Sequence, residues 1–179
     1  RAGLLETPEI SLALAWLKRL VNPNDRLSAA EIKLISGETS LESLLRSLQQ
    51  ADPDHKWAPL DLPSPGGDLH TQSAAEALDL LIAETDLRRT VAKLGNAVQR
   101  LDNLEVLRKY AVDYESACNR LHSAATIGGF LLWLDRLAEH GKDYQGSGES
   151  PDTIRVLTYH KSKGLEYPVC ICHSLDQKL

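Results

Sequence analysis

The chain has 179 residues, 42% hydrophobic and 25% charged, which suits one globular domain, or one domain and a piece of another. No apolar run approaches the roughly 20 residues of a membrane span, so we expect no membrane span, signal peptide or membrane partner. The net charge of −5 argues against a surface that is basic throughout, as a general nucleic-acid coat would be.

Charge and cysteine are distributed unevenly along the chain. Residues 153–179 contain four basic and two acidic side chains, so they carry +2 while residues 1–152 carry −7. Any phosphate contact is therefore most simply placed in the tail. Three cysteines, Cys118, Cys170 and Cys172, do not suit a disulfide framework and indicate a reducing cytoplasm. The chain starts at Arg1 and contains no methionine, so we expect an internal fragment of a larger protein.

Three short helices are expected before residue 50. Thr7 suits an N-cap, Pro8 suits the first helical position, and Asn22-Pro23 should end the first helix. Capping boxes at Ser28 to Glu31 and at Thr39 to Glu42 should start the other two. The supporting apolar positions are Ile10, Ala13, Leu14, Leu17, Leu20 and Val21, the staple pair Leu27 and Ile32, and then Leu41, Leu44, Leu45 and Leu48.

A proline-rich stretch, residues 52–67, follows these helices. It holds four prolines and Gly66-Gly67, so neither a helix nor a central strand can run through it, and we expect a loop. Trp57 lies in this loop. Its indole either covers the core, the commoner role for such a large apolar side chain, or stacks on a base or a partner.

Helical periodicity resumes over four segments, at residues 73–82, 87–94, 97–123 and 126–140. The positions expected to be buried are Val98, Leu101, Leu104, Leu107, Ala111 and Val112 in the long helix and Ile127, Phe130, Leu131, Leu134 and Leu137 in the last. Gly128-Gly129 costs the last helix roughly 1 to 2 kcal/mol relative to alanines. Close helix packing or a late helix start would each account for this pair.

Basic residues on these helices are candidates for phosphate contacts. They are Arg88-Arg89, Arg100, Arg108-Lys109 and Arg120. Acidic residues are interspersed with them, which favours an ordinary solvated helix face.

Residues 141–152 show no core-forming pattern, and we expect a linker there. Gly141 and Gly146 are spaced like the glycines of a phosphate-binding loop. Ser147 and Gly148, however, stand where that loop needs lysine and serine or threonine, so the segment is not a P-loop.

The tail, residues 153–179, has a different pattern. Two β-branched runs, 154–159 and 169–172, flank a polar loop, which predicts strand, loop and strand. The polar loop holds His160, Lys161, Lys163, Gly164 and Glu166. Ligands of open α/β sheets bind at the carboxyl ends of strands, so such a loop suits a nucleotide or nucleic acid. Cys170-Ile171-Cys172 has the alternation of a buried strand rather than the spacing of zinc ligands, so we expect no metal at these cysteines with His160 and His173.

The string Thr-Tyr-His-Lys-Ser-Lys-Gly-Leu-Glu-Tyr-Pro-Val, residues 158–169, closely resembles motif V of superfamily-one helicases of the UvrD, Rep and RecB type. It is most similar to the RecB or AddA branch. Gly3-Leu4-Leu5 with Thr7-Pro8-Glu9 also resembles the opening of helical subdomain 2B. In that family, subdomain 2B is inserted into the second motor domain, 2A, just before motif V.

The resemblance implies contacts with DNA in the first half of the motif. Thr158 and His160 match positions that lie against the backbone of single-stranded DNA, and Lys161 is placed beside them. Tyr159 departs from the aliphatic residue that is usual at its position, which puts the packing beneath the expected strand in doubt.

The second half of the motif implies contacts with nucleotide. Lys163 matches a basic position between DNA and nucleotide, and Gly164 shapes the turn. Glu166 matches the carboxylate that faces the ATP ribose.

These patterns together predict a mainly α chain: a multi-helix bundle like subdomain 2B over residues 1–140, a linker over 141–152, and the first strand–loop–strand of a RecA-like α/β domain over 153–179. The resemblance implies a parent that is an ATP-dependent DNA helicase with 3′-5′ translocation, or a helicase-nuclease of the exodeoxyribonuclease V type, acting in double-strand-break repair in the bacterial cytoplasm and nucleoid. Its cofactors would be ATP and Mg²⁺, and its partners single-stranded and forked DNA and the other subunits of a RecBCD-like or AddAB-like complex.

No Walker loop, acidic metal-binding strand or arginine finger occurs in the chain, so we expect neither bound cofactor nor ATPase activity in the fragment itself. The alternative is a non-catalytic helical interaction module with a vestigial motif V.

Overall fold

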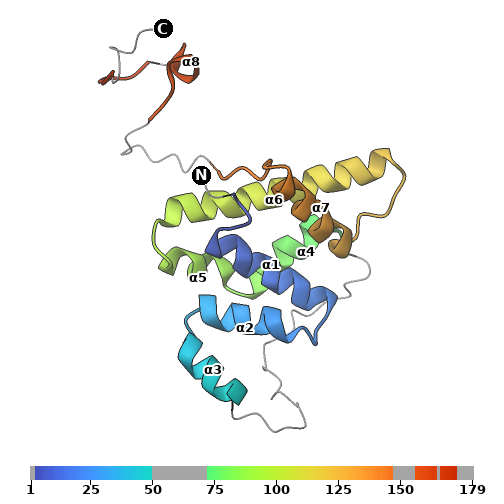
Figure 1. Ribbon diagram of the computed structural model, residues 1–179. Helices are drawn as coiled ribbons and strands as arrows, with labels where there is room; N and C mark the ends of the chain where they lie inside the picture. Colours follow the sequence, from blue (N-terminus) through green and yellow to red (C-terminus); the bar gives the residue numbers. More distant parts are fainter. Residues whose placement is uncertain (1–2, 50–71, 147–155, 165, 173–179) are drawn as a thin grey trace. The chain divides into compact units, whose positions relative to one another are not determined.

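The computed structural model describes residues 3–49, 72–146, 156–164 and 166–172, which fall into two compact units that divide between residues 149 and 150. We call residues 3–146 the helical body and residues 156–172 the tail. The proline-rich loop with Trp57 lies outside the described residues. The helices are α1 (Pro8–Val21), α2 (Arg26–Ile35), α3 (Leu41–Gln49), α4 (Ala74–Glu84), α5 (Leu87–Lys93), α6 (Ala97–Arg120), α7 (Ile127–Glu139) and α8 (Tyr159–Ser162) (Figure 1).

The mainly helical fold is confirmed, because the residues with described positions contain helices and no strand. Within those same residues, no helix has the length and apolar character that a membrane crossing needs.

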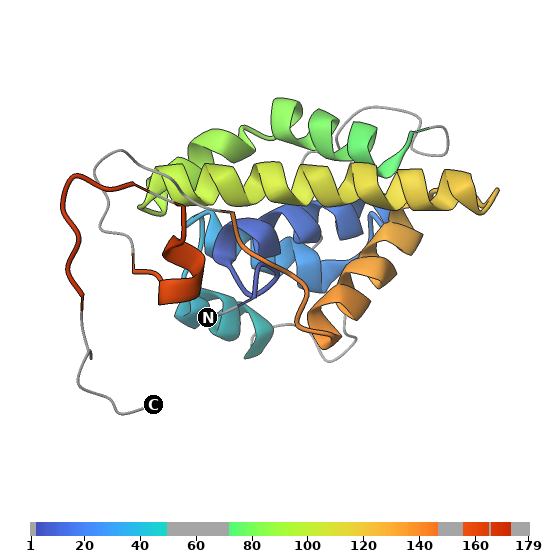
Figure 2. The ribbon, with the colours of Figure 1, turned by 90° about the horizontal axis from the view of Figure 1, so that it is seen from above.

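Helix α1 lies at the centre of the helical body and packs against α2, α4, α6 and α7. Figure 2 shows the long α6 running across the body, with α1 beside it. The buried side chains of α1 occupy nearly its whole circumference: Ile10, Leu12, Ala13, Ala15, Trp16, Leu17 and Leu20. A helix with apolar residues on nearly all sides must be enclosed by other helices, and α1 organises the core for this reason.

The caps of α2 and α3 differ from those predicted. Helix α2 is capped by Asp25, whose Oδ1 accepts a hydrogen bond from the Ser28 amide at 3.1 Å, so Ser28 is the third helical residue rather than the cap. Leu27 is 80% exposed and forms no staple. Aspartate is among the strongest N-caps, and its presence three residues before Ser28 starts the helix earlier. In α3 the accepting hydroxyl belongs to Ser40, which receives the Ser43 amide at 3.1 Å.

The buried face of α6 is also displaced from the predicted one. Leu104, Leu107 and Ala111 are buried as expected, whereas Val98 and Val112 are 53% and 42% exposed. The remaining buried positions of this helix are Asn103, Tyr114 and Cys118. A stripe defined by aliphatic residues alone misses them, because an amide, a phenol and a thiol also fill positions at helical spacing.

The glycine pair in α7 has a steric cause. A Cβ on Gly129 would lie 2.2 Å from the Tyr114 hydroxyl, so close packing of α7 on α6 requires glycine there. Gly128, by contrast, has nothing within 4 Å of its Cβ position. The ring of Tyr114 is itself held between Phe130 and Trp133, at centroid distances of 5.7 and 5.9 Å, and has little freedom to move aside.

Residues 142–146, inside the stretch predicted to be a linker, pack against the start of the chain. The Leu4 amide donates to the backbone oxygen of Asp143 at 2.8 Å, and the Leu5 amide donates to its Oδ2 at 3.2 Å. The Tyr110 hydroxyl donates to the Lys142 carbonyl at 3.2 Å and accepts the Tyr144 amide at 3.0 Å. Backbone contacts of this kind leave no hydrophobic signature, which is why the sequence shows no pattern here.

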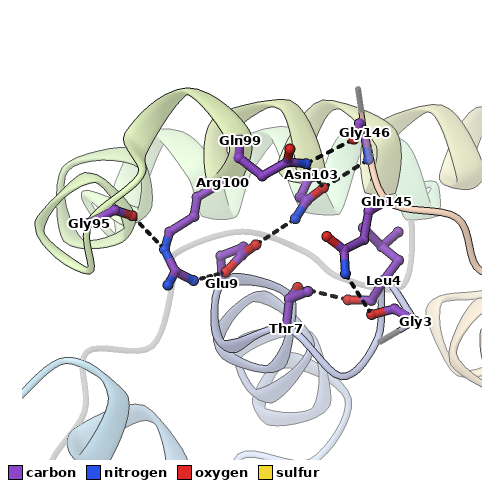
Figure 3. Close-up of polar contacts among 10 residues, drawn as sticks. All are labelled: Gly3, Leu4, Thr7, Glu9, Gly95, Gln99, Arg100, Asn103, Gln145 and Gly146. Carbon is purple, nitrogen blue, oxygen red and sulfur yellow. Dashed lines mark hydrogen bonds and ion pairs between the residues drawn. The ribbon is translucent and has the colours of Figure 1, made fainter. Parts of the chain in front are cut away.

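A buried polar cluster joins α1, α6 and this returning segment (Figure 3). The carboxylate of Glu9, 2% exposed, accepts from Arg100 and from Asn103 Nδ2, the latter at 2.6 Å. Asn103 Oδ1 accepts from the Gly146 amide at 2.9 Å and from Gln99 Nε2 at 3.0 Å. Gln99 Nε2 also donates to the Gly146 carbonyl at 2.8 Å. A buried carboxylate is tolerated only when it is paired and hydrogen-bonded, and this cluster meets both conditions.

Removing Asn103 should destabilise the helical body. Asn103→Ala leaves Glu9 short of one donor and the Gly146 amide without its acceptor, which should cost about 2 to 4 kcal/mol in the free energy of unfolding. Asn119→Ala, an exposed site on the same helix, should stay within about 0.5 kcal/mol. Urea denaturation followed by circular dichroism measures both, and equal midpoints for the two variants would contradict a structural role for the cluster.

The two glycines of α7 should respond to alanine in opposite directions. Gly128→Ala should stabilise the body by up to about 1 kcal/mol, because alanine is the better helix former and its methyl group meets no atom. Gly129→Ala should destabilise it by about 1 to 3 kcal/mol, because the methyl group overlaps the Tyr114 hydroxyl. Thermal melts of the two variants provide the comparison, and a stabilised Gly129→Ala would show that Tyr114 yields freely.

Candidate functional site

The motif-bearing tail forms a short helix where the sequence predicted the end of a strand and a loop. Tyr159–Ser162 is helical, with the Ser162 amide donating to the Thr158 carbonyl at 3.1 Å. The Ser162 hydroxyl closes the same turn by donating to the Tyr159 carbonyl at 2.9 Å. Gly164 then adopts a φ of 81°, the left-handed conformation that glycine accepts without strain. The prediction that Gly164 shapes a turn is thus matched by its backbone.

The strands predicted on either side of the motif are not formed in the described part of the tail. Val156 and Leu157 precede α8 without regular structure, and residues 169–172 follow it in the same way. Val169 and Ile171 are 78% and 89% exposed, and neither is covered as a buried strand would be. The reason is physical: a strand exists through hydrogen bonds to a neighbouring strand, and the described residues provide none.

Tyr159 stands between two basic side chains. Its ring meets the His160 ring edge-on, at a centroid distance of 6.0 Å and an angle of 81°, and Lys163 Nζ lies 5.6 Å from its centroid. A cation over a ring at this distance contributes about 0.5 to 1 kcal/mol at an exposed site. Tyr159 is 75% exposed, so it does not pack beneath a strand.

The predicted DNA-facing and nucleotide-facing side chains lie on one short segment. Thr158 and His160 are exposed, and Lys161 lies in α8 between His160 and Ser162. Lys163 and Glu166 are exposed on the far side of the turn. The structure therefore brings His160 and Lys163 together around Tyr159, and it records no contact that joins Glu166 to them.

This arrangement suits contact with a nucleic acid. Lysine and histidine provide donors and positive charge for phosphate oxygens, and an exposed tyrosine ring offers a face on which a base can stack. Tyr159 was missed as a functional candidate by the sequence reasoning, which treated it as a departure in packing. The signal that identifies it is an aromatic residue directly followed by two basic ones.

The cysteines of the tail are exposed rather than buried. Cys170 and Cys172 both lie on the surface, contrary to the buried strand predicted for them, whereas Cys118 is buried in the helical body. Across the residues with described positions, no group of three histidine, cysteine, aspartate or glutamate side chains is placed to hold a metal ion.

Most of the basic residues proposed on the helices are already paired with acids. Arg88 meets Glu105 at 2.6 Å, and Arg108 meets Asp79 at 2.6 Å. Arg89 lies 3.6 Å from Asp86, and Arg100 is bound to Glu9 in the buried cluster. These pairs favour the solvated-face interpretation over a phosphate-binding surface.

Comparison with known proteins gives one consistent group of relatives, the AddA subunits of ATP-dependent helicase/nucleases. The chain is 28% identical over 202 aligned residues, 98% of its own length, to the AddA protein of Oceanobacillus iheyensis. It is 34% identical over 110 residues, 60% of its length, to the AddA proteins of Bacillus cytotoxicus and Bacillus cereus. No family model matches the chain.

These relatives are much longer than the chain. It spans 16% of the Oceanobacillus protein, and the shorter alignments cover 8% of the Bacillus proteins. The resemblance to RecB-like and AddA-like helicases seen in the motif is confirmed by these matches. The chain is therefore homologous to a segment of the AddA proteins, which are subunits of ATP-dependent helicase/nucleases.

Proposed function

We propose that the chain is a segment of an ATP-dependent helicase-nuclease that moves 3′-5′ along single-stranded DNA during double-strand-break repair. The observation that carries this proposal is the match over 98% of the chain to a protein named as a subunit of an ATP-dependent helicase/nuclease. The motif at residues 158–169 supports it independently, because its string is that of a helicase motif.

Within this proposal the tail contacts DNA and nucleotide. Thr158, His160 and Lys161 are assigned to the DNA backbone, with the exposed ring of Tyr159 available to a base. Lys163 and Gly164 stand between DNA and nucleotide, and Glu166 accepts hydrogen bonds from the ribose hydroxyls.

ATP and Mg²⁺ fit this chain only in part. The exposed carboxylate of Glu166 and the turn at Gly164 suit the ribose side of a nucleotide. The sequence holds no glycine-rich loop ending in lysine and serine or threonine, so it offers no cradle for the triphosphate. We therefore assign phosphoryl transfer to other parts of the longer protein, and none of its steps to these residues.

The helical body is proposed as a binding and regulatory subdomain. Its net charge is negative, and its arginines are largely paired with carboxylates, which makes it a better surface for protein than for the phosphates of DNA. Other subunits of a helicase-nuclease complex are the partners of first choice. The second candidate, a helical interaction module with a vestigial motif, is favoured by the exposure of the whole tail.

The DNA contact is tested by removing two lysines from the tail. Lys161→Ala with Lys163→Ala should weaken binding of a fluorescent forked DNA and reduce the slope of log K against log salt by about 1 to 2. Lys93→Ala with Lys109→Ala removes the same charge from exposed sites of the body and should leave the slope nearly unchanged. Fluorescence anisotropy over a salt series measures both, and identical slopes for the two double variants would refute a DNA contact at the motif.

The nucleotide contact is tested in the longer protein that carries this segment. Glu166→Ala should raise the KM for ATP about tenfold, the equivalent of one hydrogen bond to a charged group, with a smaller change in kcat. The 179-residue chain by itself should show no magnesium-dependent ATP turnover above buffer. A coupled ATPase assay decides both, and robust turnover by the isolated chain would contradict the division of labour proposed here.

A further inference from the structure

Helix α2 has a second apolar face that the core of the body does not use. Ala29 and Ile32 are almost fully buried, and α2 packs on α1. The positions Leu27, Ala30, Glu31 and Leu34, at helical spacing i, i+3, i+4 and i+7, instead line a groove. Spacing of this kind defines one continuous side of a helix.

The groove lies between α2, the start of α1 and helix α3. It measures about 600 Å³, and its other apolar walls are Pro8, Ile35 and Leu44. Neither Leu41 nor Leu44 of α3 belongs to the core of the body. An elongated apolar groove between two helices is the form of site that accepts an amphipathic helix from another protein.

The charged residues of the groove all have one sign. Glu6 and Glu31 line it, and no basic residue is among the described residues that do so. Glu6 lies at the exposed edge, where its carboxylate accepts the Gly3 amide at 3.1 Å. Two carboxylates beside apolar walls repel the phosphates of DNA and attract a cationic partner.

Glu31 is the residue that specifies the charge of the ligand. It is half-buried, and burial raises the pKa of its carboxyl group, with Asp25 adding to the rise and Lys18 opposing it. No described residue forms a hydrogen bond or ion pair with it. A carboxylate on an apolar wall without a close cation is electrostatically incomplete, and a lysine or arginine from a partner would complete it.

We propose that this groove, which we call the α2–α3 groove, is a docking site for a basic amphipathic helix of a partner protein. The leucines of such a helix would pack on Leu34, Ile35 and Leu44, and its lysine or arginine side chains would meet Glu31 and Glu6. The site involves no residue of the tail, so the docking proposal stands or fails independently of the DNA and nucleotide contacts.

A model peptide tests the proposal directly. The probe is a fluorescent 14-residue helix of leucine and lysine with all leucines on one face, and the control probe has the same composition in an order that gives no apolar face. We expect the amphipathic peptide to bind the 179-residue chain and the scrambled peptide to bind at least about tenfold more weakly. Equal affinity for the two probes, or no binding of the first, would overturn the proposal.

Charge variants locate the site. Glu31→Lys should weaken peptide binding about tenfold or more, and Glu31→Gln, which keeps the side-chain volume, should give a smaller loss of the same sign. Glu139→Lys changes the net charge equally at an exposed position of α7 and should alter affinity less than about twofold. Circular dichroism melts establish that each variant is folded. Equal losses from Glu31→Lys and Glu139→Lys would indicate attraction by net charge alone and refute the site.

Sedimentation of the wild-type chain examines the other occupant, a second copy of the chain. A monomer at the concentrations of the binding experiment supports a heterologous partner. A dimer that Glu31→Lys dissociates would show that the groove binds its own copy, and would overturn the docking proposal.

Discussion

The helical body depends on one buried carboxylate, that of Glu9. An ionised side chain in the interior is costly unless charge and hydrogen bonds surround it, and Arg100 and Asn103 supply them. Because both partners lie on α6 and Glu9 lies in the first turn of α1, this interaction fixes how the two central helices meet. The amide of Asn103 extends the constraint to Gly146, so the returning segment is held in the same cluster.

The first and last described residues of the body are consequently neighbours. Leu4 and Leu5 are hydrogen-bonded to Asp143, and Gly3 has no space for a side chain, since a Cβ there would lie 2.1 Å from the Asp143 carboxylate. A module whose two chain crossings lie side by side can be inserted into another domain without disturbing that domain. This geometry supports the proposed layout, in which the helical body is an insertion and the tail begins the next part of a larger protein.

The two units differ in what stabilises them. The body has a contiguous apolar core and a satisfied polar cluster, whereas the described tail residues are mostly exposed and share one turn of helix. A motif can therefore be specific in sequence and still lack its own fold, because its side chains are meant to face ligands rather than a core. The ring of Tyr159 between His160 and Lys163 is the one local arrangement of rings and charges that the described tail residues make by themselves.

The sequence by itself determined the helices, their approximate ends and the relation to helicase-nuclease proteins, because helical periodicity, caps and a dense motif are local signals. Asp25 in place of Ser28 as the cap of α2 shows the limit of such signals, since two good caps compete and only one is used. Tertiary structure alone decided the pairing of Glu9 with Asn103, the need for glycine at position 129, and the groove beside Glu31. These features depend on residues distant in the chain meeting in space, and no periodicity or spacing within one segment records such a meeting.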